Sequence, residues 1–434
     1  MLRALLRVVF AAGVLAAAGD GDAHAQDLRT DEAPEQEPIT PGGAAARIDS
    51  GLLTEPRVLG AAIDAGFVRF GDTGLPSNGF YVELSNMITG SGWVSVGPGY
   101  RHEILNGNGF IDGSAAVSWH AYNMAQGRVV FPELLQNHFT LGAQVMWQDQ
   151  TQIDYFGIGS SSLPTDETEY RLQTVDSVGW AVMRPLPSLT LTGSIGFLRR
   201  PDVLSPGGTF RSGVPATPVL FPNDPGVSDA FQPNYAHNEV ALMSDTRDHR
   251  SRPTSGSLYR AAVTTYIDQS TSTNLFSFRQ YEAEGLQFIP VTRDRTWIFA
   301  LHAWTVWCDV APGRQVPFYM QPTIGGNNTL RSYPDYRFHD LNMVVANAES
   351  RWALFTHVDV ALFMDAGNVA PVYQDLNLAK KSYGGGVRLH TDKATFARAD
   401  VAWGAEGWAF VFRTSDVFRL ARITRRVAAV PFVP

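Results

Sequence analysis

The chain has 434 residues and a net charge of −8, and only 18% of its residues are charged. The acidic balance, without any Lys/Arg cluster, excludes a nucleic-acid partner. A single cysteine, Cys308, excludes an internal disulfide framework. The high aromatic content (11%) and the 40 glycines argue against the usual division of such a length into several soluble domains.

The N-terminus predicts export. Two arginines, an apolar run over 8–18 and a small-residue cleavage site at Ala23-His24-Ala25 are typical of a signal peptide over 1–25. The apolar run is too short to cross a bilayer as a helix, which argues against the alternative of an N-terminal anchor. Residues 26–60 are rich in Pro, Glu, Asp, Ala and Gly without periodicity, so we expect a disordered periplasmic arm.

From 61 to 418 the chain is a succession of period-two segments separated by Gly, Pro, Asn, Asp and Ser clusters, which predicts strands throughout. The clearest segments are 79–87, 93–103, 139–148, 189–197, 258–267, 296–307, 341–353, 358–367, 396–403 and 408–418. The segment 61–70 is either a strand or an inward segment, and 201–233 and 312–338 are expected to be loops. The fold class is therefore all-β, with about sixteen antiparallel strands.

The faces of these strands distinguish a membrane barrel from a soluble sandwich only in part. In 358–367, for example, Val360, Leu362 and Met364 lie opposite Asp359 and Asp365. Such a strand fits either an apolar core with charges in water, or an apolar face in lipid with charges in a wet lumen. Strand length, aromatic residues near strand ends and the signal peptide favour the transmembrane β-barrel.

The segment 325–368 carries the most informative constellation. Arg331 lies in a Gly/Asn/Pro-rich loop, and the two following strands carry Glu349 and Asp365 in otherwise apolar alternation. A carboxylate within a strand is costly unless a charge meets it. We therefore expect the loop to fold into the lumen, where Arg331 pairs with both acids. The pair either only fixes the loop in place or belongs to a moving, functional element, and the sequence leaves both open.

A second motif, at 244–268, places Asp245, Arg247 and Asp248 at the end of one strand, before a Pro-Thr-Ser-Gly turn. These charges could touch a substrate, but Asp and Arg beside such a turn are ordinary turn chemistry. We favour the interpretation that they hold one strand pair together.

Together the two motifs resemble the bacterial surface antigen family, the BamA- and TamA-like outer-membrane barrels. The resemblance implies that an extracellular loop enters the lumen and that its Arg-Gly-Tyr/Phe tip docks on strand acids. Arg331 and Tyr333 match the tip, with Glu349 and Asp365 as the acids. Ser332 replaces the glycine between the tip residues. Gly325, Gly326 and Gly367 match the loop and turn glycines.

The last strand resembles the signal that outer-membrane barrels present to their assembly machinery, with Gly407 followed by Phe410 and Phe412. The chain would then be a client of that machinery. A basic tail, 419–434, follows the barrel, which we assign to 61–418. The well-known members carry POTRA domains before the barrel, whereas 26–60 is too short and too polar to bury a core, so we expect a member without them.

No catalytic motif, cofactor motif or metal-ligand spacing is found in the sequence; His302 and Cys308 lie too far apart on one strand to share a metal. We therefore expect no enzyme, no cofactor and no metal. The function that the resemblance implies is outer-membrane protein or lipid assembly or translocation, with membrane lipid and an unfolded barrel or lipid substrate as partners. A passive channel or structural barrel is the alternative, and an adhesin or receptor using the long loops is a third.

Overall fold

The computed structural model describes residues 51–60, 78–84, 95–135, 138–206, 213–227, 232–249, 252–390 and 395–413. The predicted signal peptide, the arm before residue 51, the ambiguous segment 61–70 and the basic tail 419–434 lie outside the described residues.

One antiparallel sheet of 16 strands makes up most of the described chain, which confirms the predicted fold class. Each strand pairs with the next in chain order, except that β11 pairs with β14 across a small two-stranded sheet, β12–β13. The strands are β1 (Gly79–Leu84), β2 (Ser95–Ile104), β3 (Gly109–Ser118), β4 (Asn123–Leu134), β5 (Phe139–Tyr155), β6 (Thr168–Leu186), β7 (Leu189–Leu204), β8 (Tyr235–Asp245), β9 (Gly256–Asp268), β10 (Phe278–Pro290), β11 (Trp297–Asp309), β12 (Thr323–Ile324), β13 (Phe338–His339), β14 (Asn342–Ala353), β15 (Val358–Ala370), β16 (Lys380–His390), β17 (Thr395–Gly404) and β18 (Gly407–Arg413).

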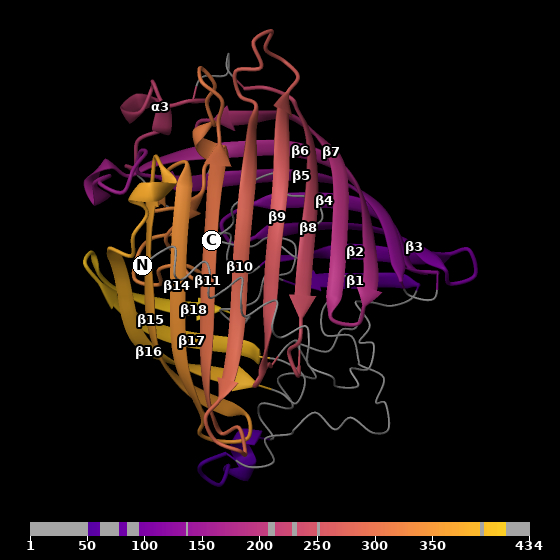
Figure 1. The fold of residues 1–434 in the computed structure, drawn as a ribbon, viewed down its shortest axis with the longest axis vertical. Coiled ribbons are helices and arrows are strands. Elements are labelled where there is room, and N and C mark those ends of the chain that lie inside the picture. Colours follow the sequence, from indigo (N-terminus) through magenta and orange to yellow (C-terminus); the bar gives the residue numbers. More distant parts are fainter. Residues whose placement is uncertain are drawn as a thin grey trace.

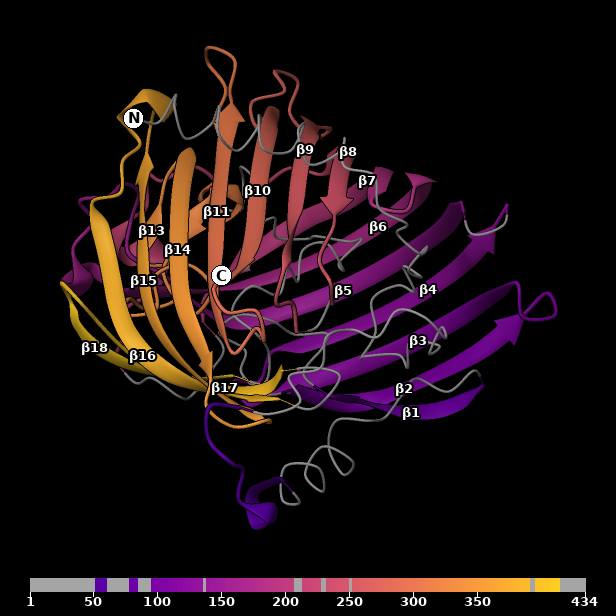
Figure 2. The same cartoon turned by 60° about the horizontal axis from the view of Figure 1, so that its bottom comes forward.

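The sheet curves into a barrel wall around a central lumen (Figures 1 and 2). One end carries short turns, such as 187–188 between β6 and β7, and the other carries long connections, such as 310–341 between β11 and β14. We call these the short-turn end and the long-loop end. The helical turn α3 (Thr217–Leu220) lies at the long-loop end (Figure 1). No helix among the residues described is both long and apolar enough to cross a membrane.

Alternation along each strand separates an apolar outer face from a polar inner face. On β15, Leu362 is 58% exposed, whereas its neighbour Phe363 is 5% exposed. On β18, Phe410 is 61% exposed and Val411 only 7%. Because successive side chains of a strand point to opposite faces, the outer face collects the large exposed apolar groups and the inner face collects the buried charges.

The long strands exceed the predicted ones. β5 continues to Tyr155 and β7 to Leu204, so the predicted loop 201–233 begins inside a strand and also contains α3. The alternation predicts where these strands start, but it fades at the long-loop end. There, the side chains of β5 from Gln148 onward are buried or half-buried on both faces of the strand.

Residues 51–60, the end of the predicted arm, lie against the short-turn end. The amides of Leu52 and Leu53 donate to the carbonyls of Ala353 and Leu354, at 2.8 and 2.9 Å. The Glu55 carboxylate accepts from the backbone N–H of His357 and pairs with the His357 imidazole at 2.8 Å. The expectation of disorder therefore does not extend to these ten residues. Figure 2 shows the indigo segment below the barrel.

Candidate functional site: an arginine-locked loop in the lumen

The β11–β14 connection folds back on itself as the short hairpin β12–β13. Gly325 and Gly326 follow β12 with φ of +124° and +84°, values that favour glycine. The Thr329 hydroxyl closes the turn, accepting from the Gly325 amide at 2.8 Å and donating to the Gly325 carbonyl at 2.7 Å. These local bonds present Arg331 to the inner face of the sheet. We call residues 310–341 the lumen loop.

Arg331 is fully buried against carboxylates from three strands. Its Nε and Nη2 donate to the two oxygens of Asp365, at 2.9 and 2.7 Å, and its backbone N–H donates to the same carboxylate at 3.2 Å. Nη1 bonds Glu349 and lies 3.5 Å from Asp400 on β17. The guanidinium also lies 3.4 Å from the ring centre of Phe363. The structure thus brings together the three charged residues that the sequence paired, and it adds Asp400.

Three further arginines, all on strands, bind two of these acids, Glu349 and Asp400. Arg351 donates to Glu349 at 2.7 Å, and Arg388 on β16 donates to both Glu349 and Asp400. Arg398 bonds Asp400 at 2.9 Å and the carbonyl of Asn327 in the lumen loop at 3.1 Å. All of these side chains are at most 4% exposed. Glu349 and Asp400 are therefore shared between Arg331 and arginines of the strands, whereas Arg331 is the arginine that binds Asp365.

The tip beside Arg331 is fitted closely to the wall. The Ser332 amide donates to the Ser382 hydroxyl at 3.0 Å, and Ser332 has none of the positive φ values recorded for the described residues. Its hydroxyl lies 2.1 Å from where a Cβ on Gly404 would stand. Ser332, at the position where the resemblance implies a glycine, is therefore accommodated by a glycine on β17. Tyr333 is buried and meets Phe338 edge-on at 5.5 Å.

Gly367, the remaining predicted glycine, lies on β15 opposite Val345. A Cβ there would stand 2.6 Å from the Val344 carbonyl oxygen, so this position packs closely against β14.

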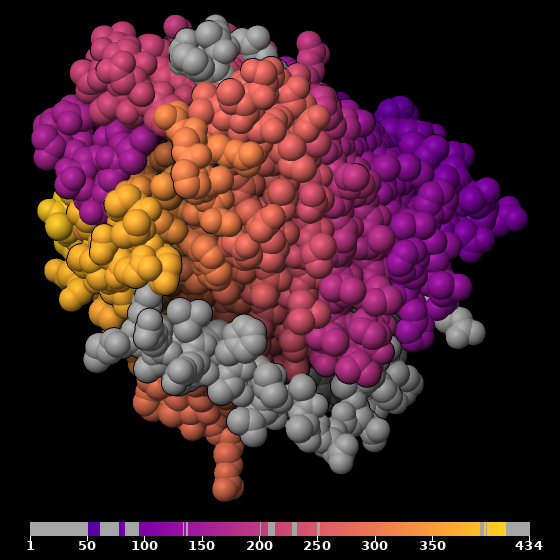
Figure 3. Space-filling model, turned by 45° about the horizontal axis from the view of Figure 1, so that its top comes forward, coloured from indigo at the N-terminus to yellow at the C-terminus, as the bar shows by residue number. Residues whose placement is uncertain are grey.

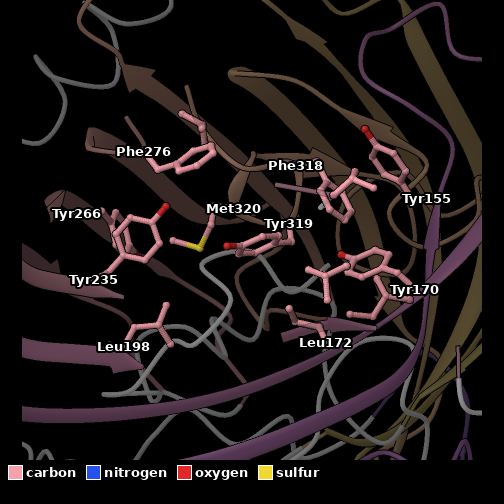
Figure 4. Packing of buried hydrophobic residues seen from close by; sticks show 14 of the residues in the cluster. Tyr155, Tyr170, Leu172, Leu198, Tyr235, Tyr266, Phe276, Phe318, Tyr319 and Met320 are labelled. Carbon is pink, nitrogen blue, oxygen red and sulfur yellow. The ribbon is translucent and has the colours of Figure 1, made fainter. Parts of the chain in front are cut away.

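The lumen loop is also anchored by aromatic packing, away from the Arg331 site. Phe318, Tyr319 and Met320 of the lumen loop pack among inward side chains of β5 to β10, as Figure 4 shows. Phe318 lies 4.8 Å from the rings of both Tyr155 and Tyr170. The cluster includes Tyr155, Tyr170, Leu172, Leu198, Tyr235, Tyr266, Phe276, Phe278, Phe318, Tyr319, Met320 and Tyr336. The loop is thus held on two sides of the lumen.

His339, at the end of the hairpin, lies against this cluster. Its ring is 5.0 Å from Tyr155 and 6.5 Å from Tyr336. Burial lowers the pKa of His339 to about 3, so the imidazole is neutral at physiological pH.

The strand-end motif lies elsewhere, at the short-turn end. Both oxygens of Asp245 accept from Arg247, at 2.9 and 2.7 Å. Asp248 accepts from the backbone amides of Thr254 and Ser255. It also accepts from the Arg295 guanidinium, in the β10–β11 turn, at 2.7 Å. These contacts organise one turn and tie it to the next. They do not place the motif with Arg331.

The predicted C-terminal signal occupies β18. Gly407 starts the strand with φ +119°, and Phe410 and Phe412 point outward, 61% and 53% exposed. Both aromatic side chains therefore lie on the outer face of the barrel.

His302 and Cys308 lie on the inner side of β11. His302 pairs with Glu284 and Asn347, each at 2.7 Å, and Cys308 packs against the aromatic cluster. Within the described part of the chain, no group of three His, Cys, Asp or Glu residues is arranged to hold a metal ion.

Sequence reasoning did not assign roles to Arg337, Arg388, Arg398 and Asp400. Arg398 and Asp400 alternate with apolar residues in the predicted strand 396–403. This pattern predicts that both point inward, but it does not identify them as partners of the loop. Arg337 carries no such signal, because it lies in a loop without periodicity.

Comparison with known proteins agrees with this fold. Residues 128–408 match the Omp85 superfamily domain. The fold is similar to BamA from Haemophilus ducreyi lacking POTRA domains 1–3, with a TM-score of 0.56 and 15% identity over 77% of this chain and 69% of that one. No curated protein matches the chain.

Two structures of CdiB are similar at lower scores. CdiB from Acinetobacter baumannii gives a TM-score of 0.45 and 10% identity, over 77% of this chain and 58% of that one. CdiB from Escherichia coli gives 0.46 and 15%, over 79% and 61%. The domain match spans most of the sheet and the whole lumen loop, and with it the chain belongs to the Omp85 superfamily of outer-membrane β-barrel proteins.

Proposed function

We propose that this barrel acts in the assembly or translocation of outer-membrane proteins or lipids, with its lumen closed at rest by the arginine-locked loop. The observation that carries the proposal is the burial of Arg331 between Asp365, Glu349 and Asp400. Short turns face the periplasm and long loops the exterior in outer-membrane barrels, so we place the lumen loop on the outer side.

The energetics of the lock favour two discrete states of the loop. A fully paired buried guanidinium is stable, whereas removing one partner leaves uncompensated buried charge, at a cost of about 3–5 kcal/mol. Partial release is therefore disfavoured. The loop is either docked or fully withdrawn into water, as a gated path for a substrate requires.

The loop end is also crowded by other segments. In Figure 3 the β5–β6 and β7–β8 connections, the lumen loop and the β15–β16 connection gather on this face. The Phe318 amide donates to the Pro225 carbonyl, and the Gly159 amide donates to the His339 carbonyl at 2.7 Å. This crowding supports an occluded resting state.

Single-channel conductance of the refolded full chain in planar bilayers tests the occlusion. We expect small or flickering currents from the wild type and longer, larger openings from Arg331→Gln. Arg314→Gln, at an exposed position of the same loop, is the matched control and should behave as wild type. A large, steady wild-type current would contradict the closed lumen and favour the alternative, a passive channel.

The assembly role needs its own assay. A small barrel diluted from urea into liposomes that contain this chain should insert faster than into liposomes without it, as followed by its mobility on unheated gels. Equal insertion rates would leave the chain as a structural barrel, even if its lumen is closed. A parallel assay of labelled-lipid movement between leaflets separates a lipid substrate from a protein one.

A further inference from the structure

A second buried arginine of the lumen loop, Arg337, has partners other than those of the lock. Its Nε and Nη2 pair with the two oxygens of Glu406, at 3.0 and 2.9 Å. Its Nη1 donates to the hydroxyl of Ser162 at 2.8 Å, and its Nη2 donates to the Ser162 carbonyl at 2.7 Å. Arg337 is only 1% exposed, so these bonds form in a largely dry environment.

The partners of Arg337 belong to segments far apart in the chain. Glu406 lies in the two-residue turn between β17 and β18, and Ser162 lies in the β5–β6 connection. That connection is also joined to the hairpin directly, since Ile158 forms a parallel bridge with His339. One side chain therefore joins the lumen loop to the last hairpin of the sheet and to a loop from its first half.

The surroundings hold Arg337 in one orientation. Its guanidinium lies 4.7 Å from the ring centre of Phe156 and 4.4 Å from that of Phe338, whose ring also meets Lys380 at 4.4 Å. The preceding residue, Tyr336, has φ +58°, an unfavourable value for a bulky side chain. Such strain persists only where neighbouring contacts over-determine the backbone.

We propose that Arg337 is a second locking residue, which couples the lumen loop to the β17–β18 hairpin so that the two move together. The proposal rests on the loop lock of the proposed function and extends it. Arg331 fixes the loop to the inner faces of β14, β15 and β17, whereas Arg337 fixes the outer end of the last hairpin to the loop. The hairpin can move outward only if the Arg337–Glu406 pair breaks or the loop leaves with it.

Hydrogen exchange of the refolded full chain in micelles tests this coupling without any transport readout. In Arg337→Gln we expect about 10-fold faster exchange at the β18 amides nearest the turn and at the Gly159 amide. Amides exchange from locally open states, and losing hydrogen bonds to a charged group raises the population of such a state by about one power of ten or more. Glu406→Gln should affect the β18 amides but spare the Gly159 amide. Arg314→Gln, in the same loop, should leave both unchanged.

Two outcomes separate this inference from the proposed function. If Arg337→Gln does not fold, Glu406→Gln alone decides, since its side chain is 20% exposed and the substitution keeps its size. Unchanged exchange near the β17–β18 turn in a folded variant would overturn the coupling, whatever the conductance of Arg331→Gln. Faster exchange in β18, together with an open wild-type pore, would uphold the coupling and overturn the closed lumen.

Discussion

The lumen loop is held by two regions of the barrel that differ in chemistry. Toward β14–β17, Arg331 meets three buried carboxylates in fixed geometry. Toward β5–β10, Phe318, Tyr319 and Met320 pack among tyrosines and aliphatic side chains. The ionic region loses most of its stability when one partner goes, whereas the aromatic region loses stability in proportion to the area removed. We therefore expect the first to respond to mutation as a switch and the second as a graded clamp.

The sharpest way to break this comparison is Arg331→Gln. We expect a loss of about 3–5 kcal/mol in the free energy of unfolding, because Asp365 and Glu349 stay buried with fewer positive partners. Arg331→Lys should recover only part of it, since an ammonium cannot bind Asp365 at two points. Urea unfolding of the refolded chain measures both variants. A loss within about 0.5 kcal/mol, the range expected for the exposed Arg314→Gln, would contradict the switch.

The aromatic clamp should respond gradually to truncation. Phe318→Leu is expected to cost about 1 kcal/mol and Phe318→Ala about 3 kcal/mol, following the volume removed. Tyr373→Ala, at an exposed position of the β15–β16 connection, is the control and should change little. If the two regions are independent, Phe318→Leu and Arg331→Gln should add to within about 0.5 kcal/mol. Strong non-additivity would show one cooperative anchorage instead.

The contact between Ser332 and Gly404 tests the fit of the loop tip. Gly404→Ala should destabilise the barrel by about 2 kcal/mol, because the new methyl overlaps the Ser332 hydroxyl. Adding Ser332→Gly should recover part of this loss. Recovery stays partial because the Lys381 carbonyl oxygen also lies 2.9 Å from that Cβ position. If the double mutant unfolds at the same urea concentration as Gly404→Ala, the overlap with the Ser332 hydroxyl is not the cause of the destabilisation.

The smallest effect concerns acidification at the aromatic side. Since the pKa of His339 is lowered to about 3, the unfolded chain binds more protons than the folded one below the ordinary histidine pKa. His339 therefore subtracts stability as pH falls from about 6.5 toward 3, and has no effect above that window. Between pH 7.5 and 5.5 the wild type should lose about 1 kcal/mol more than His339→Gln. Equal losses would show that folding does not lower the pKa of His339 from its value in the unfolded chain.

Local sequence patterns predicted much of the fold. Period-two alternation predicted ten of the strands, a total of about sixteen and the outward position of Leu362 and Phe410, because each depends only on neighbouring residues along the chain. The same alternation placed Glu349 and Asp365 inside, and their burial cost indicated a cation for them. What it missed at the long-loop end, such as the extension of β5 to Tyr155, is a stretch where side chains on both faces of the strand are buried.

The sequence by itself determined that this chain forms an antiparallel membrane barrel with a loop arginine facing two strand acids. Only the tertiary structure decided which further groups complete the site: Asp400 and Arg388 on the later strands, and the pairing of Arg337 with Glu406. The physical reason is range. Alternation and turn chemistry act over a few residues, whereas these contacts depend on how far the loop reaches into the lumen and on which strands the closing wall brings to face it.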